Sequence, residues 1–225
     1  MYNHTHRVLT AFYNRNKFEA DKLIYVPLGR DGQHKWHEVS GCIWSSKTRI
    51  GSKVTLEEHY ANLKPFFVDF LGVRTLTLSM VYEELVRLGS LPDASIEDTM
   101  DHIMSLNSFL METNPADYPS SSQLVDANIL PIWEVDGTVS LASSKSDFVI
   151  CDRTHLEKIF AAKFNELDFI FEDVCRLGPF IEYLGINKKR LSEAVIESTK
   201  VDPNDVQPLA RADREIGPKA YSLYR

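Results

Sequence analysis

Hydrophobic and polar positions follow two different periods along this chain, and each period predicts one kind of element. Apolar residues at helical spacing predict helices over residues 5–21, 55–72, 77–87, 95–112 and 154–164. Aromatic and β-branched runs around turn residues predict two hairpins, over residues 23–44 and 129–143, and a short strand over 147–152. The second hairpin contains Asp136-Gly137, which suits a type I′ turn. We therefore expect an α+β, helix-rich fold.

Local signals predict where these helices begin and end. Thr55 and Glu58 have the spacing of a capping box, and Ser95 with Asp98 forms a related pattern. Pro65 should kink the helix that begins at Thr55. Pro27 places its own strand at a sheet edge, because proline cannot donate to a ladder.

One phrase of the sequence occurs twice. PFFVDFLGVRTLTLS (Pro65–Ser79) and PFIEYLGINKKRLS (Pro179–Ser192) share Pro-Phe, Leu-Gly, a β-branched residue and Leu-Ser, with one residue more before Leu-Gly in the first copy. We interpret both as helix corners, in which glycine ends a helix in the left-handed conformation and the next residue packs back on it. Ser79 and Ser192 are then expected to cap the following helices.

The corners predict two related halves. Each follows a hairpin-like segment, so the order strand pair, helix, Leu-Gly corner, helix occurs twice. Residues 114–122 hold two prolines and three serines, typical of a loop. We therefore expect an N-terminal half over residues 1–116 and a C-terminal half over residues 117–225, which can also pack as one domain.

Composition limits the classes of function. Hydrophobic residues make up 44% of the 225 residues, enough for a sizeable core. The net charge of −7 provides no overall attraction to nucleic-acid phosphates, and the basic run at residues 187–190 is expected to be the solvated edge of a loop. No apolar run approaches the ~20 residues of a membrane span, and the first residues lack a signal peptide's apolar region. The three distant cysteines fit reduced thiols, so we expect an intracellular protein, cytoplasmic or nuclear.

Candidate chemistry is sparse. His34 and His37 could hold a metal with His4 and His6, but residues three apart on a strand point to opposite faces. Adjacent carboxylates diverge by about 100° on a helix, so we expect solvated faces or helix-start charges rather than an acid–base pair at Glu57-Glu58, Glu83-Glu84, Glu97-Asp98 and Glu172-Asp173. Trp36, Trp44 and Trp133 are interpreted as buried aromatic anchors. The cysteines are interpreted as partly buried small side chains. Cysteine–histidine catalysis is the alternative, with Cys42, Cys151 or Cys175 and His37, His59 or His155.

Two groups of residues carry a resemblance to one region of sacsin-like and NO VEIN-like proteins, whose amino-terminal part is a histidine-kinase or Hsp90-type ATPase. The first group is Trp36, Cys42-Ile43-Trp44, Lys53-Val54-Thr55-Leu56, Tyr60, Phe66-Phe67 and Leu71-Gly72-Val73. The second is similar to the region that follows in fungal members: Asp147-Phe148-Val149-Ile150, Asp152-Arg153, Leu167-Asp168-Phe169, Pro179-Phe180, Leu184-Gly185, Arg190-Leu191-Ser192, Glu197 and Thr199.

The resemblance implies a middle or carboxy-terminal region beyond the ATPase domain. The nucleotide-binding asparagine, DxGxG-type turn and glycine-rich lid of that class are not found, since Asp31-Gly32 and Asp136-Gly137 lack the second glycine. We therefore assign no catalytic, cofactor-binding or metal residue. The expected function is a non-enzymatic structural or protein-interaction module with a protein partner. The alternative is an enzyme of unrecognised type with a small-molecule pocket between the two halves.

Overall fold

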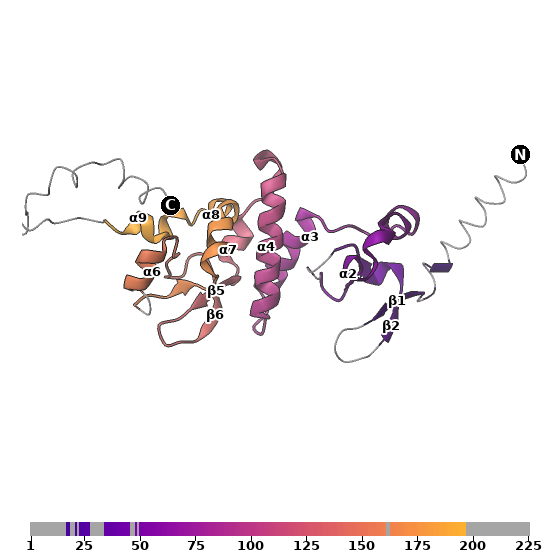
Figure 1. Cartoon of the computed structure of the whole chain (residues 1–225), viewed down its shortest axis with the longest axis horizontal. Helices are drawn as coiled ribbons and strands as arrows, with labels where there is room; N and C mark the ends of the chain where they lie inside the picture. The colour runs from indigo at the N-terminus through magenta and orange to yellow at the C-terminus, as the bar shows by residue number, and fades with distance from the viewer. Residues whose placement is uncertain are drawn as a thin grey trace, which may run out of the picture. The chain divides into compact units, whose positions relative to one another are not determined.

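The computed structural model of this protein describes residues 17–18, 21, 23–27, 34–45, 48, 50–160 and 163–196. Residues 1–194 form one compact unit and residues 195–225 a second, of which Val195 and Ile196 are described. Helices and short strands alternate along the described residues (Figure 1), which confirms the α+β, helix-rich fold. The helix expected over residues 5–21 lies, but for Lys17, Phe18 and Asp21, outside them.

The first half opens with the predicted hairpin. Strands β1 (Ile24–Pro27) and β2 (His34–His37) pair antiparallel, and Pro27 lies opposite His34. Their sheet has no third strand among the described residues. Pro27 is therefore in an edge strand, as predicted, where a missing N–H can be tolerated.

A small parallel ladder follows the hairpin. After the 3₁₀ turn η1 (Val39–Gly41), strand β3 (Cys42–Ile43) pairs in parallel with β4 (Val54–Thr55). The next residue, Trp44, forms a parallel bridge with Thr75. This bridge joins the ladder to the chain segment that follows the first Leu-Gly corner.

The single helix expected over residues 55–72 is three shorter ones: α2 (Glu57–Tyr60), the 3₁₀ turn η2 (Ala61–Leu63) and the π-helix η3 (Pro65–Phe70). The capping-box prediction is wrong, because Thr55 is paired in β4 and Leu56 takes the N-cap position without a side-chain bond. Pro65 opens η3, where its missing N–H leaves no helical bond unmade.

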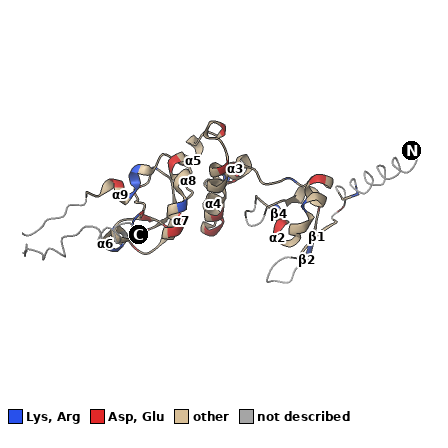
Figure 2. Cartoon of the chain, turned by 45° about the horizontal axis from the view of Figure 1, so that its top comes forward, with Lys and Arg blue, Asp and Glu red and all other residues tan. Residues whose placement is uncertain are grey.

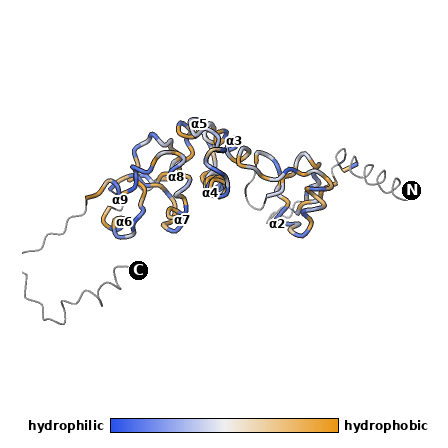
Figure 3. Tube along the Cα trace, turned by 90° about the horizontal axis from the view of Figure 1, so that it is seen from above, coloured by the Kyte–Doolittle hydropathy of each residue, from blue (hydrophilic) through white to orange (hydrophobic). Residues whose placement is uncertain are grey.

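Two longer helices match their predicted ranges. These are α3 (Leu78–Leu88) and α4 (Ile96–Glu112), and the Ser95 side chain caps α4 by accepting a bond from the Asp98 N–H at 3.2 Å. Helix α4 packs against α3 and α8 (Gly178–Tyr183) and lies between them (Figure 1). Hydrophobic and hydrophilic residues interleave along its trace (Figure 3), and its buried apolar side chains are Ile103, Leu106 and Leu110.

The connection to the second half is the predicted loop, with the 3₁₀ turn η4 (Pro115–Asp117), followed by the short helix α5 (Ser122–Asp126). The predicted second hairpin pairs β5 (Leu130–Trp133) antiparallel with β6 (Val139–Ala142), and β5 also pairs with β7 (Glu166–Leu167). The strand order is therefore β6-β5-β7.

The turn of this hairpin differs from the predicted type I′ turn. The Gly137 N–H donates to the Glu134 carbonyl at 2.9 Å, and the Glu134 N–H donates to the Thr138 carbonyl at 2.8 Å. The tight turn thus spans Glu134–Gly137, and Gly137 closes it with φ 86. This is the longer hairpin connection, in which glycine occupies a left-handed bulge position.

The rest of the second half is made of single bridges and short helices. The strand expected over residues 147–152 is reduced to parallel bridges from Val149 to Glu166 and from Ile150 to Arg190. The helix expected over residues 154–164 is described as far as Phe160, and Phe164 lies outside it. The helices and 3₁₀ turns are α6 (Thr154–Phe160), α7 (Phe171–Arg176), α8, η5 (Asn187–Lys189) and α9 (Leu191–Ala194).

The predicted order of strand pair, helix, Leu-Gly corner and helix is found in both halves, and the second half has the additional helix α6 before β7. Each has a hairpin, a short strand, a second strand that runs parallel to it, a helix, the Leu-Gly corner and a further helix. Trp44 makes backbone bonds on both sides of Thr75, at 2.8 and 3.2 Å. Ile150 bonds in the same way on both sides of Arg190, at 2.8 and 3.0 Å.

Both corners have the expected backbone. Gly72 and Gly185 have φ values of 77 and 71, and the β-branched residues that follow them, Val73 and Ile186, are buried. A positive φ is strained for any residue with a Cβ, which explains why glycine occupies both positions.

The extra residue of the first copy is absorbed by a π-helix. The Leu71 N–H donates to the Phe66 carbonyl, five residues back, at 3.0 Å. In the second copy the Leu184 N–H donates to the Phe180 carbonyl, four residues back, also at 3.0 Å. A single inserted residue in a helix is accommodated by this change of hydrogen-bond spacing. The two Leu-Gly pairs therefore keep equivalent places despite unequal spacing.

The serine caps expected after the corners are wrong. Helix α3 begins one residue before Ser79, and the Thr77 hydroxyl accepts the Met80 N–H at 3.4 Å. Ser192 lies inside α9 and donates its own N–H to Asp152 Oδ1 at 3.0 Å. The carboxylate of Asp152 thus caps α9, where the sequence predicts a cap by the hydroxyl of Ser192.

Two hydrophobic cores are present. The smaller one lies within the first half and comprises Ile24, Val26, Cys42, Trp44, Leu56, Phe67, Leu71 and Val73. The larger one includes residues from both sides of the 114–122 loop, such as Leu110 and Leu124. The division between residues 116 and 117 stays a prediction. The larger core shows how segments on either side of it pack together.

Candidate functional site

The histidines considered as metal ligands are not brought into a described cluster. His34 and His37 lie at the two ends of β2, and His4 and His6 are outside the described residues. Among the residues that are described, no three His, Cys, Asp or Glu side chains are placed to hold a metal ion. Likewise, no described helix is long and apolar enough to cross a membrane.

The three cysteines have different surroundings. Cys42 is buried in β3, and this burial raises the pKa of its thiol to about 11. Its thiol therefore stays protonated near neutral pH, which disfavours the alternative in which it is a nucleophile. Cys151 is half-buried and its thiol donates to Glu166 Oε2 at 3.1 Å. Cys175 is exposed, so the expectation of partial burial is wrong for this residue.

Three of the four carboxylate pairs are helix-start charges, as expected. They lie in the first turns of α2, α4 and α7, where Figure 2 shows acidic residues. Carboxylates are favoured there because the helix dipole is positive at the N-terminus. The fourth pair is different, because Glu84 is buried and the prediction of a solvated face is wrong for it.

Glu84 ties α3 to the loop that precedes β4. Its Oε1 accepts the Gly51 N–H at 3.0 Å and an Arg87 N–H at 2.6 Å, and Oε2 accepts the Arg87 Nε–H at 3.0 Å. Burial alone would raise the pKa of Glu84, but these bonds and the charge of Arg87 outweigh it, so the pKa lies below its ordinary value. Glu84 is therefore a structural carboxylate that joins two segments.

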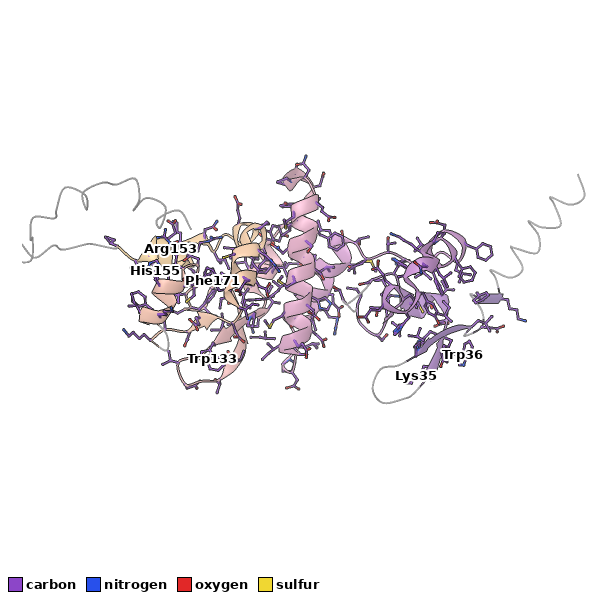
Figure 4. All side chains as sticks on the ribbon, viewed as in Figure 1. Lys35, Trp36, Trp133, Arg153, His155 and Phe171 are labelled. Atoms are coloured by element: carbon purple, nitrogen blue, oxygen red, sulfur yellow. The ribbon has the colours of Figure 1, made fainter. Side chains whose placement is uncertain are left out.

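The tryptophans do not share one role. Trp44 is buried in the smaller core, as predicted. Trp36 and Trp133 are exposed, so the prediction of burial is wrong for both (Figure 4). Trp36 stands opposite Tyr25 in the hairpin and makes an edge contact with its ring, while β1 buries its neighbours Ile24 and Val26 on the other face. The hairpin thus has one covered face and one open face.

Trp133 is one of four exposed apolar side chains on segments that contact one another, and these four are here called the Trp133 patch. Trp133 is paired with Glu166 across β5 and β7, and the Val135 N–H donates to Asn165 Oδ1 at 3.0 Å. These contacts bring the hairpin turn to the segment that contains Phe164, whose ring lies 5.9 Å from that of Phe160. The exposed members of the patch are Trp133, Val135, Ile159 and Phe164.

A groove of about 620 Å³ lies within the first half, along α4. One wall is a face of α4, with Ser105, Ser108, Phe109 and Glu112. The rest of the lining comes from the segment after β3, from α2 and the residues before Pro65, and from the segment after the first corner: Trp44, Ser45, Thr48, Glu57, Lys64, Thr75 and Leu76. The hydroxyls of Thr48 and Ser105 are hydrogen-bonded to each other, which links the two walls. The lining combines hydroxyl groups and a few apolar side chains with two carboxylates and one ammonium group.

Sequence patterns alone did not identify the groove or the Trp133 patch. The spacing of Ser105, Ser108, Phe109 and Glu112 places them on one face of the predicted helix, but no local signal says what faces them. For Trp133, the aromatic ring in a predicted strand indicates burial, and nothing nearby in the sequence shows that its face of the strand is uncovered. Such sites depend on tertiary contacts between distant segments.

Comparison with known proteins gives one match. The family model described as Domain of unknown function (DUF8348) matches residues 79–195, which is more than half of the chain and runs from α3 to the residue after α9. Neither the curated proteins nor the solved structures contain a match. The chain therefore belongs to the family of the domain of unknown function DUF8348.

Proposed function

We propose that this protein is a non-enzymatic protein-interaction module that works inside the cell. The observation that supports the proposal is the Trp133 patch, whose side chains are 41% (Trp133), 54% (Val135), 56% (Ile159) and 48% (Phe164) exposed. Contiguous exposed apolar surface is uncommon on soluble proteins and commonly marks an interaction site. Tryptophan in particular is enriched among residues that contribute most to binding energy.

The resemblance to sacsin-like and NO VEIN-like proteins is compatible with this function. We propose that the chain corresponds to a region beyond the ATPase domain of such proteins and acts there as a structural or partner-binding extension. The residues that carry the resemblance include Cys42, Trp44, Leu71 and Leu184, which are buried. They stabilise a fold rather than perform a reaction.

Substitution of the patch tests the proposal. Proximity labelling in cells should recover partners with the wild-type chain that are lost with the double variant Trp133→Ser/Phe164→Ser. Trp36→Ser is the matched control, because Trp36 is also an exposed hairpin tryptophan, at 56%, outside the patch. Circular dichroism melting establishes that both variants fold. An unchanged partner set for the double variant would contradict the proposal.

A small-molecule enzyme remains the second candidate, because the groove has a volume in the range of ligand pockets. Glu57 and Glu112 are the groups in it that could transfer protons. A ligand-observed NMR screen with wild-type chain and the variant Glu57→Gln/Glu112→Gln tests this candidate, which requires a ligand that the variant no longer binds. Calorimetric titration with ATP and Mg²⁺ is expected to give no saturable binding at micromolar concentration. Saturation would contradict the assignment of the chain to a region without a nucleotide site.

A further inference from the structure

The segment after the first corner presents an unpaired backbone edge in the groove. Trp44 donates its N–H to the Arg74 carbonyl at 2.8 Å and accepts the Leu76 N–H at 3.2 Å. In this parallel arrangement the N–H and C=O of Thr75 point away from Trp44. Neither group of Thr75 has a hydrogen-bond partner among the described residues, and Thr75 is exposed.

The second half closes the equivalent edge. Arg190 is the bridge partner of Ile150, as Thr75 is of Trp44, although the sequence repeat aligns Arg190 with Thr77. Its N–H donates to the Asn187 carbonyl at 3.0 Å, and its carbonyl accepts the N–H groups of Glu193 and Ala194 at 3.0 and 3.1 Å. The parallel bridge is therefore open on its outer side at Thr75 and closed at Arg190, which directly precedes α9.

The side chains around the open edge offer contacts for an extended ligand. Leu76 and Phe109, which are partly buried, provide apolar surface in the groove, and Glu57 and Glu112 provide two carboxylates against the single ammonium of Lys64. A strand that pairs with Thr75 would place alternate side chains on opposite sides. Apolar residues on one side and basic residues on the other would match these groups.

We infer that the groove binds an extended, basic peptide segment of a partner protein by strand addition to Thr75. Main-chain hydrogen bonds supply affinity in this recognition mode, and pockets for alternate side chains supply specificity. The inference deepens the proposed interaction function but uses a surface different from the Trp133 patch. An experiment can therefore contradict peptide binding in the groove without contradicting partner binding at the Trp133 patch, and the reverse.

The test uses the full chain and a capped seven-residue peptide in which lysine and valine alternate. NMR titration should give saturable shifts at the Thr75 amide, and exchange of that amide with solvent should slow by about tenfold or more in the complex. A peptide with glutamate in place of lysine should bind several-fold more weakly, because Glu57 and Glu112 then repel it.

Two variants separate the backbone from the side chain of Thr75. Thr75→Pro removes the outward N–H but keeps the Arg74 and Leu76 bonds to Trp44, and it should weaken binding about tenfold. Thr75→Val keeps the N–H and the β-branched shape, so binding should be unchanged. Should Thr75→Pro fail to fold, the wild-type chain with a peptide N-methylated at alternate residues gives the same comparison, and the methylated peptide should not bind.

The inference is overturned by the absence of saturable binding, by equal binding to Thr75→Pro, or by equal binding of the methylated peptide. Displacement of the peptide by a small molecule that leaves the Thr75 amide unshifted would also contradict it. Trp133→Ser is expected to bind the peptide like the wild type. Loss of peptide binding in that variant would contradict the separation of the two surfaces.

Discussion

The two halves share a chain path but differ in how their edges are closed. In the second half, β5 is held between β6 and β7, and the Asp168 N–H donates to the Pro131 carbonyl at 2.8 Å. In the first half, the hairpin β1–β2 stays a separate sheet, and the Tyr60 hydroxyl donates to the Tyr25 carbonyl of β1. The same order of elements therefore gives a three-stranded sheet in one half and two separate two-stranded ladders in the other, among the described residues.

The difference extends to the cores. The second half shares the larger core with α3 and α4, and this core coincides with the matched family region. The first half has a smaller core of its own. Because burial of apolar surface is the main favourable contribution to folding, we expect the first half to open at a lower free energy than the second. Unpaired strand edges can accept a strand from a partner, and segments that bind partners are commonly those of low local stability.

The largest effect is expected from Asn107→Leu, which should lower the free energy of unfolding by removing the contacts between α4 and the junction of α7 and α8. Asn107 is buried on α4; its Nδ2 donates to the Arg176 carbonyl at 3.1 Å and its Oδ1 accepts the Phe180 N–H at 3.1 Å. Removal of the amide leaves both groups at the junction of α7 and α8 unpaired, which costs about 2–4 kcal/mol in free energy of unfolding. Urea denaturation measures it.

The matched control for Asn107→Leu is Ser108→Ala, one position along the same helix. Ser108 is exposed, and its hydroxyl bonds only the Met104 carbonyl of its own helix at 3.0 Å. Its free energy of unfolding should change by less than about 0.5 kcal/mol. Equal, small effects for the two variants would show that Asn107 does not hold the second half together.

Substitution of the corner glycines sharpens the equivalence of the halves. Gly72→Ala and Gly185→Ala should each lower the free energy of unfolding by about 1 kcal/mol, because alanine is strained at φ values of 77 and 71. No atom would contact a Cβ at Gly185 within 4 Å, so the loss there is conformational. Gly178→Ala is the control, also with free space but in helix α8, and should not destabilise. Unequal losses at the two corners would weaken the equivalence.

A smaller, pH-dependent effect is expected from Glu84→Gln, which weakens the link between α3 and the Gly51 loop. The folded pKa of Glu84 lies below the ordinary value of 4.5, so its ionised form contributes stability above that value and loses it as pH falls through the folded pKa. The variant should be less stable by about 1 kcal/mol at pH 7, and this deficit should shrink as the pH falls through the folded pKa of Glu84. Melting temperatures from pH 3 to pH 7 check this.

The comparison for Glu84 is its neighbour Glu83, which is exposed on the same helix. Glu83→Gln should leave the melting temperature unchanged at every pH within the error of the scan. A Glu84→Gln deficit that does not shrink at all between pH 7 and pH 3 would show that the carboxylate charge is not what stabilises this link.

The smallest effect is a difference in thiol reactivity, which does not require a change in stability. Cys175 is exposed and should be alkylated first, whereas Cys42, buried and with a pKa of about 11, should react last. Mass spectrometry of timed iodoacetamide reactions at pH 7.5 measures the order. Early modification of Cys42 in the folded chain would mean that the smaller core opens readily, and would revise its description as a closed core.

Local signals in the sequence predict the order of the helices, strands and turns. Contacts between distant segments determine how some helices are capped and which faces are buried. The Leu-Gly corners, both hairpins and α4 with its Ser95 cap follow from residues that lie next to each other. The cap of α9 comes from Asp152, forty positions away, and no pattern near Ser192 could reveal it. The π-helix is an intermediate case, since the one-residue difference between the copies was visible but its accommodation was not.

The candidate sites, too, depend on long-range contacts that local sequence signals do not show. That Trp44 is buried while Trp36 and Trp133 are exposed depends on which face of each strand is covered, and alternation along one strand does not say which. The groove needs α4 to face α2 and the segment after β3, and the unpaired edge at Thr75 is recognised only by comparison with Arg190. The sequence repeat aligns Arg190 with Thr77 and not with Thr75, so it gives no signal for that comparison.

Amide hydrogen exchange of the free protein, resolved by NMR, tests the central claim most directly. The account predicts slow exchange at Arg190, whose N–H is bonded to the Asn187 carbonyl at 3.0 Å, and fast exchange at Thr75, whose N–H has no partner among the described residues. The Leu76 amide, bonded to Trp44 at 3.2 Å, is the internal reference for an intact first half and should exchange more slowly than Thr75. Slow exchange at Thr75 as well as at Arg190 would contradict the account, because both edges would then be closed.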